Sequence, residues 1–260
     1  MRQGTALVTG ASSGIGAEIA EILAGRGYDL IVTARRKDRL EELARSITNT
    51  HGVTVRTVVG DLSDSSSLGN TVSELTSERV DILVNNAGFG LHGRVAEADP
   101  ERLSAMIELN VNALTRLTRA VLPGMIERRQ GRILQIASVA AFQPGPLMAA
   151  YYASKAYVLS FSEALAVELE GSGVVVTTIC PGPTVTEFHE VAGNTAAAYF
   201  SGKKIPNGRD LAAYSVERLF RASHVAIHGA RYKFLVFVQR FLPRRFVARI
   251  VLSLQKSRGR

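Results

Sequence analysis

The 260-residue chain is 46% hydrophobic and 21% charged, which is ordinary for a globular protein and excludes a disordered one. From Arg218 onward there are 11 Lys/Arg and no Asp/Glu, whereas the first 217 residues carry 20 basic and 23 acidic residues. The net charge of +8 therefore belongs to the C-terminal end and says little about the main body. With a lone Cys180 and no basic-then-apolar leader, we expect a cytoplasmic protein without disulfides or a metal site.

Short β-branched runs alternate with helical patterns, which predicts a doubly wound parallel α/β sheet with helices on both faces. The expected strands are 5–9, 30–34, 53–59, 80–85, 131–137, 173–180 and 230–237. The expected helices are 15–24, 38–48, 64–78, 100–129 and 149–170, with Asp99 and Pro100 starting the fourth and Gly171 ending the fifth. One domain over 1–230 should be followed by a last strand and a tail over 231–260.

A glycine-rich loop joins the first strand to the first helix. It reads Thr9-Gly-Ala-Ser-Ser-Gly-Ile-Gly16, with the spacing G-x-x-x-G-x-G. Glycines let the backbone turn tightly and approach a pyrophosphate, and the helix N-terminus supplies free N–H groups. A turn without a ligand is the alternative, but the flanking strand and helix favour a dinucleotide site. Its expected members are Gly10, Ser12, Ser13, Gly14, Ile15 and Gly16.

The end of the second strand selects the dinucleotide. Proteins that bind NAD(H) usually carry an acidic residue there, about 20 residues after the loop. Here Arg35 and Arg36 follow the strand, and paired guanidinium groups suit a 2′-phosphate. The alternative is that the arginines are simply exposed to solvent. This would account for Arg36 but not for the absence of an acidic residue at this position, so we expect NADP(H).

Two further strand ends carry candidate cofactor-binding residues. Asp61 and Leu62 follow the third strand, where the carboxylate can meet the adenine amino group or cap the next helix. Asn86, Ala87 and Gly88 follow the fourth strand, where an amide and small residues would let the backbone approach a ribose.

Tyr151 and Lys155 stand four residues apart within the expected helix 149–170, so they share one helix face. An ammonium beside a phenol favours the phenolate and lowers the phenol pKa toward neutrality. Tyr151 is therefore a candidate general acid or base. The spacing also arises by accident on helices, so the other motifs must decide. Tyr152 and Tyr157 do not precede Lys155 by four residues, and we expect them to pack or to lie at a subunit surface.

Together these residues resemble the short-chain dehydrogenase/reductase family, from about Thr5 to Thr186. The matching motifs are the loop Thr9–Gly16, Asp61, Asn85-Asn86-Ala87-Gly88, Asn110, Ser138, Tyr151 with Lys155, and Pro181-Gly182 with Thr186. The resemblance implies a Rossmann-type fold, hydride transfer between NADP(H) and a carbonyl or alcohol, and a homodimer or homotetramer paired through helices 100–129 and 149–170.

The resemblance also implies a role for each catalytic residue. Tyr151 would protonate the substrate oxygen or deprotonate the alcohol, and Ser138 would hydrogen-bond the same oxygen. Lys155 would lower the pKa of Tyr151 and hold the nicotinamide ribose. Asn110 would position a water that links Lys155 to solvent.

The segment after the sixth strand should cover the site, again on the family resemblance. Pro181 and Gly182 would lie near the nicotinamide, Thr184 and Thr186 near its carboxamide or phosphates, and 187–206 would form a lid. Apolar residues there and near Ser138 predict a pocket for a lipophilic ketone, aldehyde or secondary alcohol. They are Phe142, Leu147, Met148, Phe188, Val191, Ala196, Ala197, Ala198, Tyr199 and Phe200.

The tail reads as a basic amphipathic helix. Its apolar stripe is Phe241, Leu242, Phe246, Val247, Ile250, Val251 and Leu254, set against Arg240, Arg244, Arg245, Arg249 and Lys256. One hypothesis places this helix on an anionic membrane, at its inner face. The other packs it on the body or on a partner subunit. The tail is too short and too charged to span a bilayer.

Two other functions compete with the enzyme. A cofactor sensor or scaffold of the same fold would have lost a catalytic residue, and none is missing from the motifs. A nucleic-acid partner is not expected, because the basic tail lacks interleaved aromatic residues and an RNA-binding motif.

Overall fold

The computed structural model of the protein describes residues 2–76, 78–184, 187–188, 192–193 and 207–256. Their centre is a seven-stranded parallel sheet in the order β3-β2-β1-β4-β5-β6-β7. The strands are β1 (Gly4–Thr9), β2 (Tyr28–Ala34), β3 (Val55–Val59), β4 (Ile82–Asn85), β5 (Gly131–Ile136), β6 (Val174–Cys180) and β7 (Val225–Ile227). The order reverses between β1 and β4, where doubly wound sheets bind ligands. The predicted fold class is confirmed.

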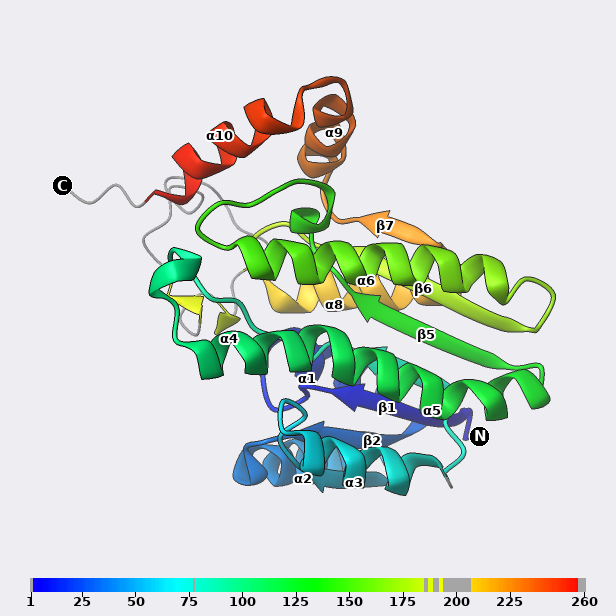
Figure 1. Cartoon of the computed structure of the whole chain (residues 1–260). Coiled ribbons are helices and arrows are strands. Elements are labelled where there is room, and N and C mark those ends of the chain that lie inside the picture. Colours follow the sequence, from blue (N-terminus) through cyan, green and yellow to red (C-terminus); the bar gives the residue numbers. More distant parts are fainter. Residues whose placement is uncertain (1, 77, 185–186, 189–191, 194–206, 257–260) are drawn as a thin grey trace.

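Helices cover both faces of this sheet (Figure 1). One layer holds α1 (Gly14–Gly25), α2 (Lys37–His51) and α8 (Gly208–Phe220), and the other α3 (Ser65–Thr76), α5 (Leu114–Glu127) and α6 (Ala149–Glu168). In β1, Ala6 and Val8 belong to the first core and Leu7 to the second. Because both faces are buried, such a strand is a continuous apolar run rather than an alternating one.

The predicted strand 230–237 is wrong. That segment is α9 (Ala230–Val238), and the last strand is the short β7, which pairs with β6. Its sequence KFLVFV has strand propensity, but Gly229 turns the chain at a φ of 91° before the helix begins. Tyr232 then packs against Gly182, and Val236 is buried. Tertiary packing therefore overrides the local β propensity.

The predicted helix 100–129 consists of three pieces. They are α4 (Pro100–Ile107), a π-helical turn over Glu108–Ala113, and α5. Asp99 caps α4 as expected, with Pro100 in the first turn. Asn110 lies in the π-helical turn, a feature found frequently at functional sites.

The sequence prediction did not include α8. Asn207 begins this helix by accepting a hydrogen bond from the amide of Asp210 at 2.7 Å. Its buried residues fall at helical spacing, a signal that could have revealed it: Leu211, Ala212, Ser215, Val216 and Leu219.

The tail forms a helical cap beyond β7 (Figure 1). It comprises α9, a 3₁₀ turn (Gln239–Phe241) and α10 (Arg244–Gln255). Val247 and Val251 are buried in a cluster with Met148 and Tyr151, so one face of α10 packs on the body of the protein. No helix in the described part of the chain is long and apolar enough to cross a membrane.

Candidate active site

The glycine loop after β1 is tied to the end of β4 by Thr9. Its hydroxyl donates to the carbonyl of Val84 at 3.2 Å and accepts from the amides of Asn86 and Ala87, each at 3.0 Å. The Asn86 side chain returns a hydrogen bond to the Thr9 carbonyl at 2.9 Å. The side chain of Asn86 therefore holds the loop, while Ala87 and Gly88 line the cavity beside it.

The loop has a backbone that suits a phosphate. Gly10 and Gly14 adopt positive φ angles of 66° and 55°, which other residues rarely take. A Cβ on Gly16 would lie 2.5 Å from both the Asn86 amide nitrogen and the Gly10 carbonyl oxygen, so only glycine fits there. The helix α1 begins within the loop, at Gly14, and its free N-terminal amides together with the loop can hold a pyrophosphate.

The two arginines after β2 have different partners. Arg36 donates to the hydroxyl of Ser12 at 3.1 Å and to that of Ser13 at 2.7 Å, so it lies against the phosphate loop. Arg35 lies 3.7 Å from Asp61, the residue expected near the adenine. All five line the same cavity, where the arginines can hold a phosphate.

Asp61 does not cap the next helix, because Asp64 accepts from the amide of Ser67 instead. Its own carboxylate accepts from the amide and the hydroxyl of Ser63 at 2.9 and 2.6 Å. Burial acts to raise the pKa of Asp61, but the hydrogen bonds from Ser63 and the charge of Arg35 lower it overall. Asp61 and the buried Leu62 both line the cavity. Of the two predicted roles, the contact with the adenine is therefore the one that fits this position.

The structure brings Ser138, Tyr151 and Lys155 together. Tyr151 and Lys155 lie on the buried face of α6, and their exposed fractions are 8% and 6%. The Lys155 ammonium donates to the carbonyl of Ile136 at 2.8 Å and lies 5.9 Å from the centre of the Tyr151 ring. Ser138 begins the turn after β5 and hydrogen-bonds Tyr151. A substrate oxygen beside the phenol would therefore meet two hydroxyl groups.

The pKa of Tyr151 is shifted in the direction opposite to the prediction. Burial raises its pKa above the ordinary value, and the contribution that lowers it comes from the hydrogen bond with Ser138. Lys155 was expected to supply this lowering. Burial instead lowers the pKa of Lys155 itself to about 8, so at neutral pH the ammonium is close to giving up a proton. Tyr151 is thus held as a neutral proton donor beside a readily deprotonated lysine.

Asn110 is fixed by hydrogen bonds on both sides of its amide. Its oxygen accepts from the amide of Phe89 at 3.1 Å, and its nitrogen donates to the carbonyl of Phe89 at 2.9 Å. The same nitrogen donates to Ser154 at 3.1 Å, and Ser154 donates to the backbone carbonyl of Tyr151 at 2.7 Å. Sequence reasoning missed Ser154, which connects Asn110 to the backbone of Tyr151.

A cavity of about 540 Å³ joins the phosphate loop to Tyr151 and continues beneath the tail. Met148 and Phe188 line it as predicted, and the Phe188 ring lies 5.3 Å from that of Tyr151. Phe142 packs in a core cluster instead. The tail supplies a further part of the apolar wall, which the sequence did not predict: Tyr232, Leu235, Val236, Val238, Leu242, Val247, Ile250, Val251 and Leu254.

The remaining predicted residues after β6 are placed as follows. Pro181, Gly182 and Thr184 line the cavity, and Thr184 donates to the Gly182 carbonyl at 3.1 Å. Thr186 lies outside the described residues, as do Val191, Ala196, Ala197, Ala198, Tyr199 and Phe200 of the expected lid.

The two other tyrosines of α6 behave as predicted. Tyr152 is buried, and its hydroxyl accepts from the side chain of Gln255 at 3.0 Å, which fastens the end of α10 to α6. Tyr157 is 38% exposed and stacks on Phe161. Neither takes the place of Tyr151.

Comparisons with known proteins agree on one family. The family model for short chain dehydrogenase matches residues 4–196. An uncharacterized oxidoreductase of Staphylococcus saprophyticus is 37% identical over 226 residues, which is 86% of this chain and 94% of that protein. Four other relatives are longer, and the chain spans only 62–65% of each.

Two solved structures are similar over nearly the whole chain. A short-chain dehydrogenase from Sphingobium yanoikuyae in complex with NADPH is 36% identical, with a TM-score of 0.83 over 92% of this chain and 94% of that one. The bulky-bulky ketone specific alcohol dehydrogenase from Comamonas testosteroni is 31% identical, with a TM-score of 0.80 over 93% and 94%.

The lowered pKa of Lys155 predicts a pH-dependent stability. Above about pH 8 the folded protein has lost the Lys155 proton that the unfolded chain, with its ordinary pKa of 10.5, still binds. The free energy of unfolding should therefore gain about 1 kcal/mol from this residue between pH 7.5 and 9.0. Urea unfolding of the wild type and of Lys155→Met should show this rise only in the wild type.

The exposed Lys233 provides the control, because Lys233→Met makes the same chemical change away from the buried site. Equal pH slopes for the wild type and Lys155→Met would show that Lys155 is not a perturbed group in the folded protein.

Proposed function

Because the chain belongs to the short-chain dehydrogenase/reductase family, we propose that it transfers hydride between NADP(H) and a lipophilic ketone, aldehyde or secondary alcohol. The chain is an oxidoreductase of the CH–OH group, and its cofactor is NADP(H). One observation supports the rest of the proposal: the cavity leads from the glycine loop, past Tyr151, into an apolar chamber built by the tail.

The bound nicotinamide supplies or accepts the hydride, and the protein handles the proton. In reduction, Tyr151 donates its phenolic proton to the substrate oxygen, while Ser138 donates a hydrogen bond to the same oxygen. Lys155 lies beside the phenol ring, and its own low pKa suits it to return the proton that Tyr151 has given up. Asn110 and Ser154 hold the backbone that carries Tyr151 in place.

The rest of the site would bind the dinucleotide. Gly10, Ser12, Ser13, Gly14, Ile15 and Gly16 would hold the pyrophosphate, Arg35 and Arg36 the 2′-phosphate, and Asp61 and Leu62 the adenine. Asn86, Ala87, Gly88, Pro181, Gly182, Thr184 and Thr186 would border the ribose and nicotinamide. A silent sensor or scaffold would require a lost catalytic group, and Ser138, Tyr151 and Lys155 are all in place.

The substrate class follows from the chamber. Val247 and Val251 are buried in its wall, and Leu242 and Met148 lie with them. A similar solved structure is that of an alcohol dehydrogenase specific for bulky-bulky ketones, which supports a large apolar substrate. Burying a further 100 Å² or so of apolar substrate surface would contribute about 2.5 kcal/mol, or a factor of roughly 50 in affinity.

We also propose that the chain forms a homodimer or homotetramer through α4, α5 and α6. Exposed apolar side chains on these helices support this arrangement, since Ile107, Ile126, Tyr157 and Val167 are each more than a third exposed.

The outer face of the tail suits an anionic lipid surface, and we propose that the protein is cytoplasmic and binds the inner face of a membrane there. Its apolar residues are Phe234 (66% exposed), Phe237 (56%), Phe241 (75%) and Phe246 (52%). Exposed cations surround them with no acidic residue on the tail: Arg231, Lys233, Arg240, Arg244, Arg245, Arg249 and Lys256. Apolar side chains framed by cations are typical of interfacial helices.

Replacement of Tyr151 by phenylalanine tests the mechanism. Tyr151→Phe removes only the proton donor, so kcat for ketone reduction should fall by about 10³-fold or more. NADPH binding, measured by fluorescence titration, should persist. Tyr152→Phe is the matched control, because it makes the same chemical change at the neighbouring tyrosine, which hydrogen-bonds Gln255. A Tyr151→Phe enzyme with wild-type kcat would disprove the assignment.

A substrate screen tests the chamber. We expect kcat/KM for NADPH-dependent reduction of a bulky aryl ketone to exceed that for a short ketose by at least about 50-fold, because only the former fills the apolar wall. Val251→Thr keeps the shape but adds a hydroxyl, and it should reduce this ratio. Preference for the ketose would refute the lipophilic substrate.

Vesicle sedimentation tests the membrane surface. The full-length protein should sediment with vesicles rich in phosphatidylglycerol but not with pure phosphatidylcholine. Phe241→Ser with Phe246→Ser should weaken this binding about tenfold or more, because both side chains are more than half exposed and would insert into the lipid. Val59→Ser with Val95→Ser, exposed elsewhere, is the control. Wild-type protein that stays in the supernatant would eliminate the membrane proposal.

A further inference from the structure

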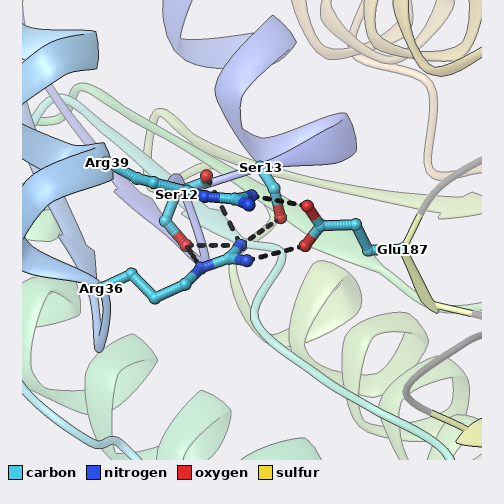
Figure 2. Close-up of polar contacts among 5 residues, drawn as sticks. All are labelled: Ser12, Ser13, Arg36, Arg39 and Glu187. Carbon is cyan, nitrogen blue, oxygen red and sulfur yellow. Dashed lines mark hydrogen bonds and ion pairs between the residues drawn. The ribbon is translucent and has the colours of Figure 1, made fainter.

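The carboxylate of Glu187 is bound by two arginines at the edge of the phosphate loop (Figure 2). Arg36 donates to one carboxylate oxygen at 2.8 Å, and Arg39 donates to the other at 2.5 Å. Glu187 is far from both in sequence, in the segment after β6, whereas the arginines begin α2. The contact therefore joins the two sides of the cavity.

The same cluster includes the loop that would hold the cofactor phosphates. Arg36 also donates to the hydroxyls of Ser12 and Ser13, and all of these side chains point toward one another (Figure 2). Two guanidinium groups thus converge on a single carboxylate, and one of them, that of Arg36, also donates to the two serine hydroxyls. Such a set of donors suits an anion with several oxygens. A phosphate meets this requirement fully, and a carboxylate meets it only in part.

Glu187 is a fully ionised ligand of this cluster. Hydrogen bonds from Arg39 and Arg36 lower its pKa to about 2, so the carboxylate keeps its charge at neutral pH. The ion pairs remain partly open to water, since the side chains of Arg36, Arg39 and Glu187 are 42%, 50% and 41% exposed. An exposed carboxylate with this modest attraction can be displaced by a more highly charged anion.

We propose that Arg39 is a binding residue for the 2′-phosphate of NADP(H) and that Glu187 is an internal competitor for the same cations. The phosphate and the carboxylate need the same guanidinium groups, so Glu187 must release Arg36 and Arg39 before the phosphate binds them. Glu187 therefore reduces the affinity for nucleotides that carry a 2′-phosphate and leaves the affinity for others unchanged.

Calorimetric titration of the full-length protein with two cofactor fragments tests this inference without turnover. Adenosine 2′,5′-bisphosphate carries the 2′-phosphate, and 5′-AMP lacks it. Glu187→Gln should tighten binding of the bisphosphate about tenfold, because the competing charge is gone, while binding of 5′-AMP changes less than about twofold. Arg39→Gln should weaken binding of the bisphosphate about tenfold and again spare 5′-AMP.

Controls separate this inference from the dinucleotide site on which it depends. Glu170→Gln removes an exposed carboxylate that precedes β6, at the opposite end of this strand from Glu187, and should leave both affinities unchanged. Glu187→Ala removes any residual hydrogen bond of glutamine and should reproduce the gain. Unchanged or weakened bisphosphate binding in both Glu187 variants would overturn the competition. Failure of the wild type to bind either fragment would overturn the site itself.

Discussion

The hydrogen bonds of Thr9 join the two strands between which the sheet reverses its order, and the site depends on that junction. The Thr9 hydroxyl hydrogen-bonds a carbonyl at the end of β4 and the two amides that follow this strand. The Asn86 side chain in turn donates a hydrogen bond to the carbonyl of Thr9 at the end of β1. Buried backbone groups need such partners. The junction fixes the glycine loop relative to the loop after β4. It thereby sets one end of the cavity at the position where α1 presents its free amides.

Burial determines the chemistry at the other end. It acts in opposite directions on Tyr151 and Lys155, because the charged form is the anion in the first and the cation in the second. A neutral phenol next to a lysine that readily loses its proton is suited to donating a proton and regaining it. The spacing of the two residues suggested an ammonium that activates a phenol. The structure adds that burial opposes this activation and that the hydrogen bond with Ser138 offsets only part of the rise in the Tyr151 pKa.

The sheet and the shared helix face of Tyr151 and Lys155 could be predicted because both depend on short-range patterns. Strands buried on two faces are continuous apolar runs, and Tyr151 with Lys155 needs only one helical turn. Features that depend on tertiary contact were not predictable in this way. The segment 230–237 has strand propensity but becomes a helix because Tyr232 packs on Gly182. Likewise, the sequence around Arg39 or Glu187 does not predict their ion pair, because the two residues are about 150 positions apart and meet only after the sheet has assembled.

The segments after β6 give the site properties that its central motifs do not. Glu187 and Phe188 are consecutive, yet one binds the arginines beside the phosphate loop and the other packs on Tyr151. Two adjacent residues therefore contact both ends of the cavity. The tail has a comparable division, because α10 buries Val247 and Val251 in the chamber while Phe246 is exposed. The helix α10 therefore contributes to the chamber wall with one face and to the outer apolar face with the other, so a change that rotates α10 must alter both.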